Sequence, residues 1–187
     1  GLGDVYKRQV RSFVDEHYRH FNAGTLGRAA RSLNGFLEEG GQVFVTLAGA
    51  MSTAEIGRTL AEMIRAGHVA AISCTGANLE EDLFNLVAHD AYVSIPFPED
   101  LSPEDEANLF ERRLNRVTDV CIPEEEAIRV IEQELMKLWT DAQAADESLL
   151  PHLHLYRLLT SGSLATSFQS DPKHSWLLAA AERNLPL

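Results

Sequence analysis

The spacing of apolar residues changes along the chain, and these changes mark its elements. From residue 10 to residue 39 apolar residues recur at helical spacing, which predicts two helices joined near residues 22–25. Gly40 and Gly41 end the second helix, because glycine readily adopts the left-handed conformation found at helix exits. The β-branched apolar run at residues 43–47 then predicts a strand buried on both faces.

A strand–turn–helix unit starts with that run. Small residues at 48–50 predict a tight turn, and Ser52 or Thr53 supplies a side-chain oxygen that can cap the start of a helix. Glu55 lies close behind, as in a capping box, and the helical period continues to about residue 65.

A second unit repeats this pattern. Residues 68–73 predict another buried strand, residues 75–78 a turn and residues 79–89 a helix. The first turn of that helix carries three carboxylates: Glu80, Glu81 and Asp82. Two consecutive units of this kind predict an α/β fold with a parallel sheet and helices packed on it.

Helices dominate the sequence that follows a polar, acidic insertion after Val93. The spacing of apolar residues predicts helices at 103–114, 123–145, 149–160 and 172–184. A short apolar run at 117–122 separates the first two of these helices. Trp139 and Trp176 have apolar neighbours at helical spacing, so both are predicted to lie in the core. Residues 184–187 are typical of a helix exit that leads into an apolar strand, and we expect the chain to be truncated there.

The composition narrows the classes of ligand. The chain has 187 residues, 45% of them hydrophobic and 24% charged, which is typical of a soluble globular domain. Its net charge of −12 has the wrong sign for neutralising phosphates, so nucleic acid is not expected as a ligand, whereas a cation is allowed. The longest apolar stretch is interrupted by small polar residues, so no membrane span is expected.

The ends of the chain and its cysteines bear on domain organisation. Residues 1–9 fit none of the predicted elements and are expected to be a non-native leader, which leaves residues 10–187 as part of a single domain. Cys74 and Cys121 are far apart and form no C-x-x-C motif. Together with the lack of a secretory leader, they favour a reduced, cytoplasmic compartment.

The two strand-to-helix turns are the candidate functional site, because ligands of open parallel sheets bind beyond the carboxyl ends of the strands. The turn at residues 47–53 offers backbone N–H groups and hydroxyls, which suits an anion, although it lacks the G-x-G-x-x-G motif. The carboxylates at 80–82 suit an ammonium group. A turn built only for packing, and ordinary acid enrichment at a helix start, are the alternatives.

No metal site and no hydrolase motif is indicated. His17 and His20 lack a third ligand, and His152 and His154 point in different directions if their segment is helical. Cys74 follows a predicted strand and is interpreted as a buried thiol.

The sequence at these turns resembles the deoxyhypusine synthase family in its bacterial branch. The similarity is carried by residues 46–57 (TLAGAMSTAEIG) and 73–82 (SCTGANLEED). It continues through 114–117 (LNRV), 122–125 (IPEE), 155–159 (LYRLL) and 171–176 (DPKHSW), and so covers most of residues 10–187.

This resemblance implies a Rossmann-like parallel sheet with helices on both faces, of which the chain would hold an incomplete N-terminal part. It implies an NAD-dependent transferase, usually a homotetramer, that oxidises spermidine and passes its aminobutyl group through an imine on an enzyme lysine. The acceptor is a protein lysine in deoxyhypusine synthases and putrescine in the related homospermidine synthases. A non-catalytic Rossmann-like binding or assembly module remains an alternative from another class.

The resemblance also implies roles for individual residues. Those expected to contact NAD are Met51, Ser52, Thr53, Ala54, Glu55, Thr75, Gly76, Ala77 and Glu81. Glu80 and Glu81 are expected to face the polyamine. In the family the catalytic lysine lies in a second half, beyond the segment that matches residues 184–186. None of the three lysines here, Lys7, Lys137 and Lys173, fits the nucleophile, so the chain alone is expected to be inactive.

Overall fold

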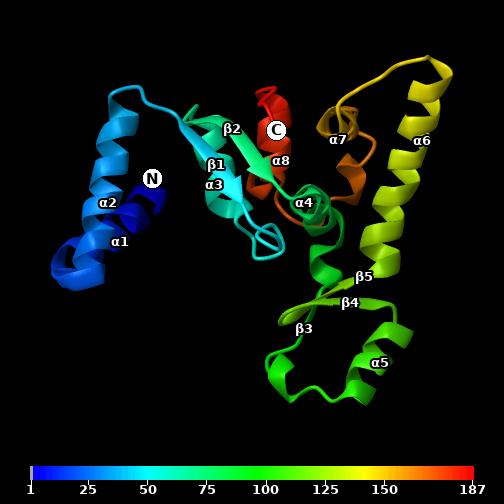
Figure 1. Ribbon diagram of the computed structural model, residues 1–187, viewed down its shortest axis with the longest axis horizontal. Coiled ribbons are helices and arrows are strands. Elements are labelled where there is room, and N and C mark those ends of the chain that lie inside the picture. Colours follow the sequence, from blue (N-terminus) through cyan, green and yellow to red (C-terminus); the bar gives the residue numbers. More distant parts are fainter. Residues whose placement is uncertain (1) are drawn as a thin grey trace. The chain divides into compact units, whose positions relative to one another are not determined.

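The computed structural model describes residues 2–187, with side chains from Gln9 onward. The chain divides into two compact units, Gly1–Gln42 and Val43–Leu187. The first contains helices α1 (Leu2–His17) and α2 (Phe21–Glu38), shown in blue in Figure 1.

The helix pair α1 and α2 differs from the prediction in two respects. The helices are joined at residues 18–20 instead of 22–25. The expectation that the first nine residues fit no element is wrong, because α1 already begins at Leu2. Gly24 and Gly27 are the buried positions of α2, and a Cβ added to Gly27 would meet Val14 at 3.7 Å.

The second unit contains the predicted parallel strands β1 (Val43–Leu47) and β2 (Val69–Cys74), in which Val45 pairs with Ile72. The backbone N–H of Ile72 also donates to the carbonyl of Pro186 at 3.1 Å, so the last residues run beside β2. Within the described chain β1 pairs with no other strand. The prediction that β1 is buried on both faces is wrong, because the Phe44 side chain is 63% exposed.

Both helices that follow these strands are shifted relative to their predicted starts. Helix α3 (Gly57–Arg65) begins after a series of turns, with positive φ at Ala50 and Glu55, instead of at a Ser52 or Thr53 cap. Its start fits tightly, because a Cβ on Gly57 would lie 2.1 Å from the His174 carbonyl oxygen. Helix α4 (Gly76–Ala88) starts three residues earlier than predicted, so its three carboxylates lie in the second turn instead of the first.

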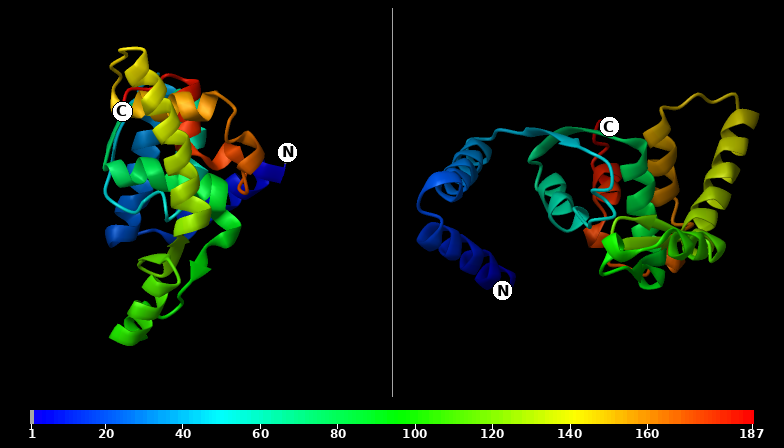
Figure 2. Two further views of the ribbon diagram at one scale, coloured as in Figure 1. Left: turned by 90° about the vertical axis from the view of Figure 1, so that its right-hand side faces the viewer. Right: turned by 60° about the horizontal axis from the view of Figure 1, so that its bottom comes forward.

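The insertion after α4 folds into a second, antiparallel sheet. Its strand order is β3 (Val93–Ser94), β5 (Val120–Pro123) and β4 (Leu114–Val117), with helix α5 (Pro103–Glu111) packed near β4. The left view of Figure 2 shows this segment extending away from the other elements of its unit. The sequence pattern predicted α5 but not the strands.

Helices from the last third of the chain complete the core. They are α6 (Val130–Ala144), which follows a π-helical segment (Glu124–Arg129), α7 (Pro151–Thr160) and α8 (Trp176–Glu182). Short 3₁₀ segments are His89–Ala91, Pro98–Asp100, Ala165–Ser167 and Pro172–His174. The single helix predicted at 172–184 is therefore divided at Ser175.

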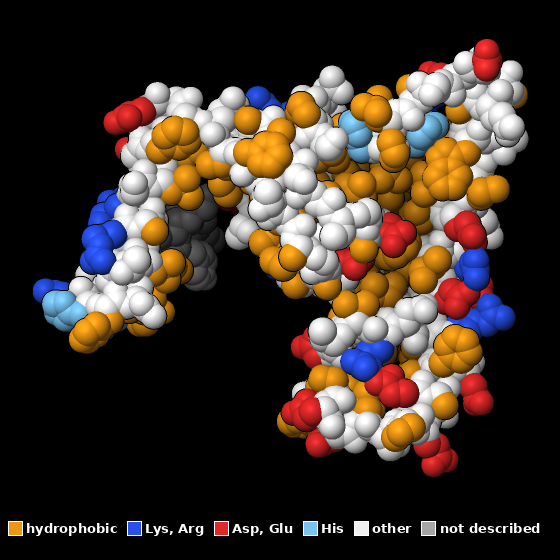
Figure 3. Space-filling view, in the orientation of Figure 1, with side chains coloured by type: hydrophobic (Ala, Val, Ile, Leu, Met, Phe, Trp, Pro, Cys, Tyr) orange, Lys and Arg blue, Asp and Glu red, His pale blue; other side chains and the backbone are white. Residues whose placement is uncertain are grey.

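Hydrophobic side chains gather between α6 and α7 (Figure 3). Trp176 is fully buried, as predicted, whereas the prediction for Trp139 is wrong, since that side chain is 46% exposed. Trp139 lies on the α6 face that also carries the exposed Met136.

The fold is mixed α/β with one two-stranded parallel sheet. The sequence predicted an incomplete part of a Rossmann-like sheet, and a full sheet of that kind is not present among the described residues. In that part of the chain no helix combines the length and apolarity needed to cross a bilayer.

Candidate functional site

The two predicted turns lie side by side, and the side chain of Asn78 joins them. Its Oδ1 accepts from the backbone N–H of Ser52 at 3.0 Å, and its Nδ2 donates to the carbonyl of Ala48 at 2.6 Å and to Thr75 Oγ1 at 2.9 Å. The Ser52 hydroxyl returns a hydrogen bond to the Asn78 carbonyl at 2.7 Å. The turn after β1 is therefore fixed to the start of α4.

Helix α8 contacts the same junction. The indole Nε1 of Trp176 donates to Ser52 Oγ at 2.9 Å. Both side chains are buried, with Ser52 1% and Trp176 0% exposed. The hydroxyl of Ser52 is thus engaged in internal hydrogen bonds, and the predicted contact of this residue with NAD stays a prediction.

Of the three carboxylates at 80–82, Glu81 is the one that contacts the turn after β1. It is 8% exposed, and its Oε2 accepts from the backbone N–H of Thr53 at 3.3 Å. The Thr53 hydroxyl is buried and has no hydrogen-bond partner among the described residues. The Glu80 residue is exposed overall. The protein still partly shields its carboxyl group from water, and this shielding, together with the Glu81 charge, raises the pKa of Glu80 above its usual value.

Asp82 does not belong to the cation-facing cluster that the sequence suggested. Its side chain is 4% exposed and points to α8, where it accepts from Ser175 Oγ at 2.5 Å and from the Leu177 backbone N–H at 3.1 Å. Burial raises the pKa of Asp82 to about 6, although these hydrogen bonds act in the opposite direction. The triplet is therefore divided between a buried structural carboxylate and two that flank the turns.

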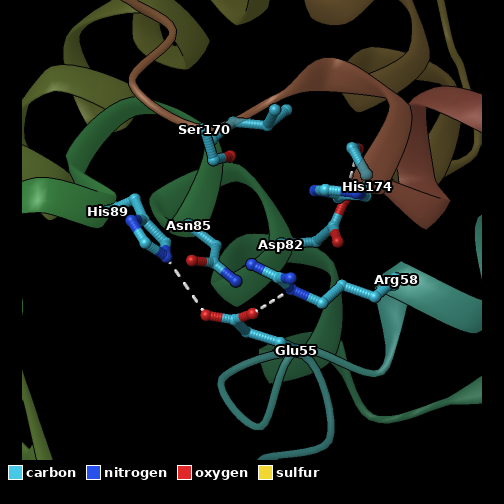
Figure 4. Close-up of a pocket in the computed structure, with 10 residues that line it drawn as sticks. Glu55, Arg58, Asp82, Asn85, His89, Ser170 and His174 are labelled. Carbon is cyan, nitrogen blue, oxygen red and sulfur yellow. Dashed lines mark hydrogen bonds and ion pairs between the residues drawn. The ribbon is translucent and has the colours of Figure 1, made fainter.

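Glu55 lines a small cavity of about 20 Å³ together with Arg58, Asn85 and His89 (Figure 4). Its carboxylate lies between Arg58 and His89 and accepts from both, with 3.1 Å to His89 Nε2. Partial burial raises its pKa, but the hydrogen bonds from His89 and Arg58 outweigh burial and hold the pKa below its usual value. The Glu55 carboxylate is engaged in these two contacts, and its predicted contact with a cofactor stays a prediction.

The other residues that were predicted to contact NAD are at least partly accessible to solvent. Thr75, Gly76 and Ala54 are exposed, and Met51 and Ala77 are half-buried. A Cβ placed on Gly76 would meet nothing within 4 Å, so the space above the start of α4 is open.

These residues fit a dinucleotide such as NAD. The fit rests on the unpartnered Thr53 hydroxyl, the open backbone at Gly76 and the Glu81 carboxylate, which together offer a donor, space and an acceptor at one place. No cluster of three or more potential metal ligands was found in the described part of the chain.

Sequence reasoning missed the residues that hold the turns together. Asn78 was assigned only to a turn and Trp176 only to the core, because a hydrogen bond between residues 124 positions apart leaves no local pattern. An amide at the start of a helix, next to three small residues, was the available signal for Asn78.

Comparison with known proteins identifies the family of this chain. A family model described as deoxyhypusine synthase matches residues 14–187. A probable deoxyhypusine synthase 1 of Archaeoglobus fulgidus is 32% identical over 112 residues, which are 60% of this chain and 35% of that protein.

Two further relatives widen the range of organisms. A deoxyhypusine synthase-like protein of Cyanothece sp. is 31% identical over 102 residues, which are 54% of this chain and 26% of that protein. A probable deoxyhypusine synthase 2 of Methanosarcina acetivorans is 30% identical over 125 residues, which are 66% of this chain and 34% of that protein. The matched regions thus span about a third of the curated relatives' lengths. With the family match over nearly its whole length, the chain belongs to the deoxyhypusine synthase family.

Proposed function

We propose that the chain is part of an NAD-dependent transferase that moves the aminobutyl group of spermidine to an acceptor amine. Family membership supports aminobutyl transfer as the reaction class. The roles of NAD and spermidine in this proposal rest on one observation: the buried Glu81 carboxylate lies 3.3 Å from the Thr53 backbone N–H. This contact joins the turn after β1, proposed to bind the cofactor and called here the cofactor-side turn, to the carboxylate pair Glu80 and Glu81.

In this proposal NAD, when bound, supplies the hydride acceptor. Thr53 donates to the cofactor from its free hydroxyl, and the open backbone at Gly76 allows a close approach at the start of α4, where the helix dipole favours a phosphate. Glu80 and Glu81 hold an ammonium group of spermidine beside it, since carboxylates attract cations most strongly where water is partly excluded. We also propose that the active protein is a homo-oligomer, a tetramer as the resemblance implies.

The test is to measure spermidine-dependent NADH formation with the complete reading frame that encodes this chain, together with NAD binding by calorimetry. We expect NADH only when spermidine is present. A homospermidine product on adding putrescine would assign a free diamine as the acceptor, whereas transfer only to a protein would assign a lysine side chain. If the protein neither forms NADH nor binds NAD, the proposal is refuted and a non-catalytic binding or assembly module is favoured.

A matched pair of variants tests the carboxylate assignment. Glu81→Gln keeps the shape of the side chain but removes its charge, so we expect spermidine to bind at least about tenfold more weakly, as is usual when a charged hydrogen-bond partner is lost. Glu111→Gln makes the same change at an exposed position on α5 and should leave spermidine affinity unchanged. Equal spermidine affinity in both variants would contradict the role of Glu81.

A further inference from the structure

We propose that Asn78 and Trp176 are a positioning pair that sets the geometry of the cofactor-side turn without touching the ligand. The inference rests on the proposed function, since it concerns how NAD affinity is established. Asn78 and Trp176 are each 0% exposed, and their side-chain N–H groups already donate within the protein, so neither has a free donor for a bound molecule.

The amide of Asn78 is fully engaged by the two turns. Both of its Nδ2 hydrogens have acceptors, at Ala48 and Thr75, and its Oδ1 has the Ser52 N–H as a donor. Because a buried polar group left unpaired is costly, these contacts can be changed only together. One side chain therefore fixes the distance between the turn after β1 and the start of α4.

Trp176 extends this control to α8. Its indole N–H donates to Ser52 Oγ, and the Ser52 hydroxyl donates onward to the Asn78 carbonyl, so the three groups form a continuous relay. The start of α8 is itself held by Ser175, whose hydroxyl donates to the buried Asp82. Loss of the Trp176 indole donor is thus transmitted to Ser52.

The relay ends next to the ligand-facing atoms. Thr53 follows Ser52 directly, and its backbone N–H makes the 3.3 Å contact with Glu81 while its hydroxyl is unpartnered. A small displacement of Ser52 therefore moves the donor proposed for the cofactor and changes the contact of Thr53 with the Glu81 carboxylate. This predicts that loss of the relay weakens NAD binding even though the ligand contacts remain in the sequence.

The experiment compares two substitutions of neighbouring, fully buried residues in α8. Trp176→Phe keeps an aromatic ring but removes the N–H donor, and Leu177→Val changes core packing without touching the relay. We expect Trp176→Phe to weaken NAD binding about three- to tenfold, as for one lost hydrogen bond, and Leu177→Val to leave it unchanged while lowering the thermal midpoint. Asn78→Asp, which removes both Nδ2 donors at constant size, should weaken NAD binding at least as much.

Two readouts require no catalysis. Amide hydrogen exchange at Ser52, whose N–H is bonded to Asn78, should become faster in Trp176→Phe and Asn78→Asp but not in Leu177→Val. The chain has two tryptophans, so Trp139→Phe leaves Trp176 as the sole tryptophan, and the tryptophan fluorescence should change when NAD is added.

The outcomes separate this inference from the proposed function. Equal loss of NAD affinity in Trp176→Phe and Leu177→Val, or unchanged exchange at Ser52 in Trp176→Phe, would overturn the positioning pair. If the unmodified protein binds no NAD, the proposed function fails. Exchange at Ser52 then still decides whether the relay holds the turn.

Discussion

Replacing Asp82 by asparagine should stabilise the protein at neutral pH. Asp82 is 4% exposed and its pKa is raised from 3.8 to about 6 by burial, so the folded protein binds its proton more tightly than the unfolded chain does. A shift of about two pKa units corresponds to about 3 kcal/mol of unfolding free energy. Asparagine has no charge to desolvate, and its Oδ1 can still accept from Ser175 and Leu177.

The sign of the pH dependence follows from proton binding. Between the unfolded pKa of 3.8 and the folded pKa of about 6, the folded state holds more protons, so Asp82 makes stability fall as pH rises through this window. Below it the carboxyl is neutral in both states and the penalty is absent. Above it the penalty is complete, and Asp82→Asn should be more stable by up to about 3 kcal/mol.

Urea unfolding from about pH 4 to pH 8 measures this effect, with stability taken as the difference between wild type and variant at each pH. That difference removes the contributions of other carboxyls, such as Glu55, whose lowered pKa acts in the opposite direction. Asp100→Asn, at an exposed position, is the control and should differ from wild type by less than about 0.5 kcal/mol throughout. An Asp82→Asn difference that is constant with pH would refute the reasoning.

Two other packing features lead to stability predictions by the same assay. Gly57→Ala should destabilise the protein strongly, because its Cβ would lie 2.1 Å from the His174 carbonyl oxygen, whereas Gly76→Ala, with no atom within 4 Å, should change stability little; equal effects would contradict the close approach. Tyr156→Phe removes a buried 2.8 Å hydrogen bond to the Leu185 carbonyl and should cost about 1 kcal/mol, so an unchanged urea midpoint would argue against that bond.

The sequence was sufficient for elements whose periodicity is strong. Strand β1 was predicted with its observed bounds and β2 within one residue, because a β-branched or small apolar run bounded by turns has few other interpretations. Helix α4 was found for the same reason, although Gly76 and Ala77 were assigned to the turn. Because the predicted start of α4 was too late, the carboxylates at 80–82 were predicted in the first helical turn, although they lie in the second.

The antiparallel sheet could not be predicted because its signals are weak. Strands β4 and β5 have four residues each, and the turn between them uses Thr118 at a φ of 54°. A non-glycine residue in that conformation gives no turn signal in the sequence. The exposed position of Trp139 was missed for a related reason, since helical spacing does not tell which apolar stripe finds a partner.

The candidate site was predicted in its location but not in its internal contacts. The two turns meet as expected for the carboxyl ends of adjacent parallel strands. The separation of Asp82 from Glu80 and Glu81 depends on Ser175 and Leu177, which lie more than 90 residues away. Contacts at such separations follow from the tertiary fold and not from local propensity.

The same long separations impose an order on biosynthesis. The ribosome synthesises β1, β2 and α4 first, but Asp82 gains its hydrogen-bond donors and Ser52 its indole partner only after residues 175–177 have emerged. Until then a nascent chain carries an ionisable carboxyl and a small-residue loop without the contacts that fix them, and non-local closure of this kind is slow. The turn after β1 is therefore one of the last features of this unit to reach its final geometry during translation.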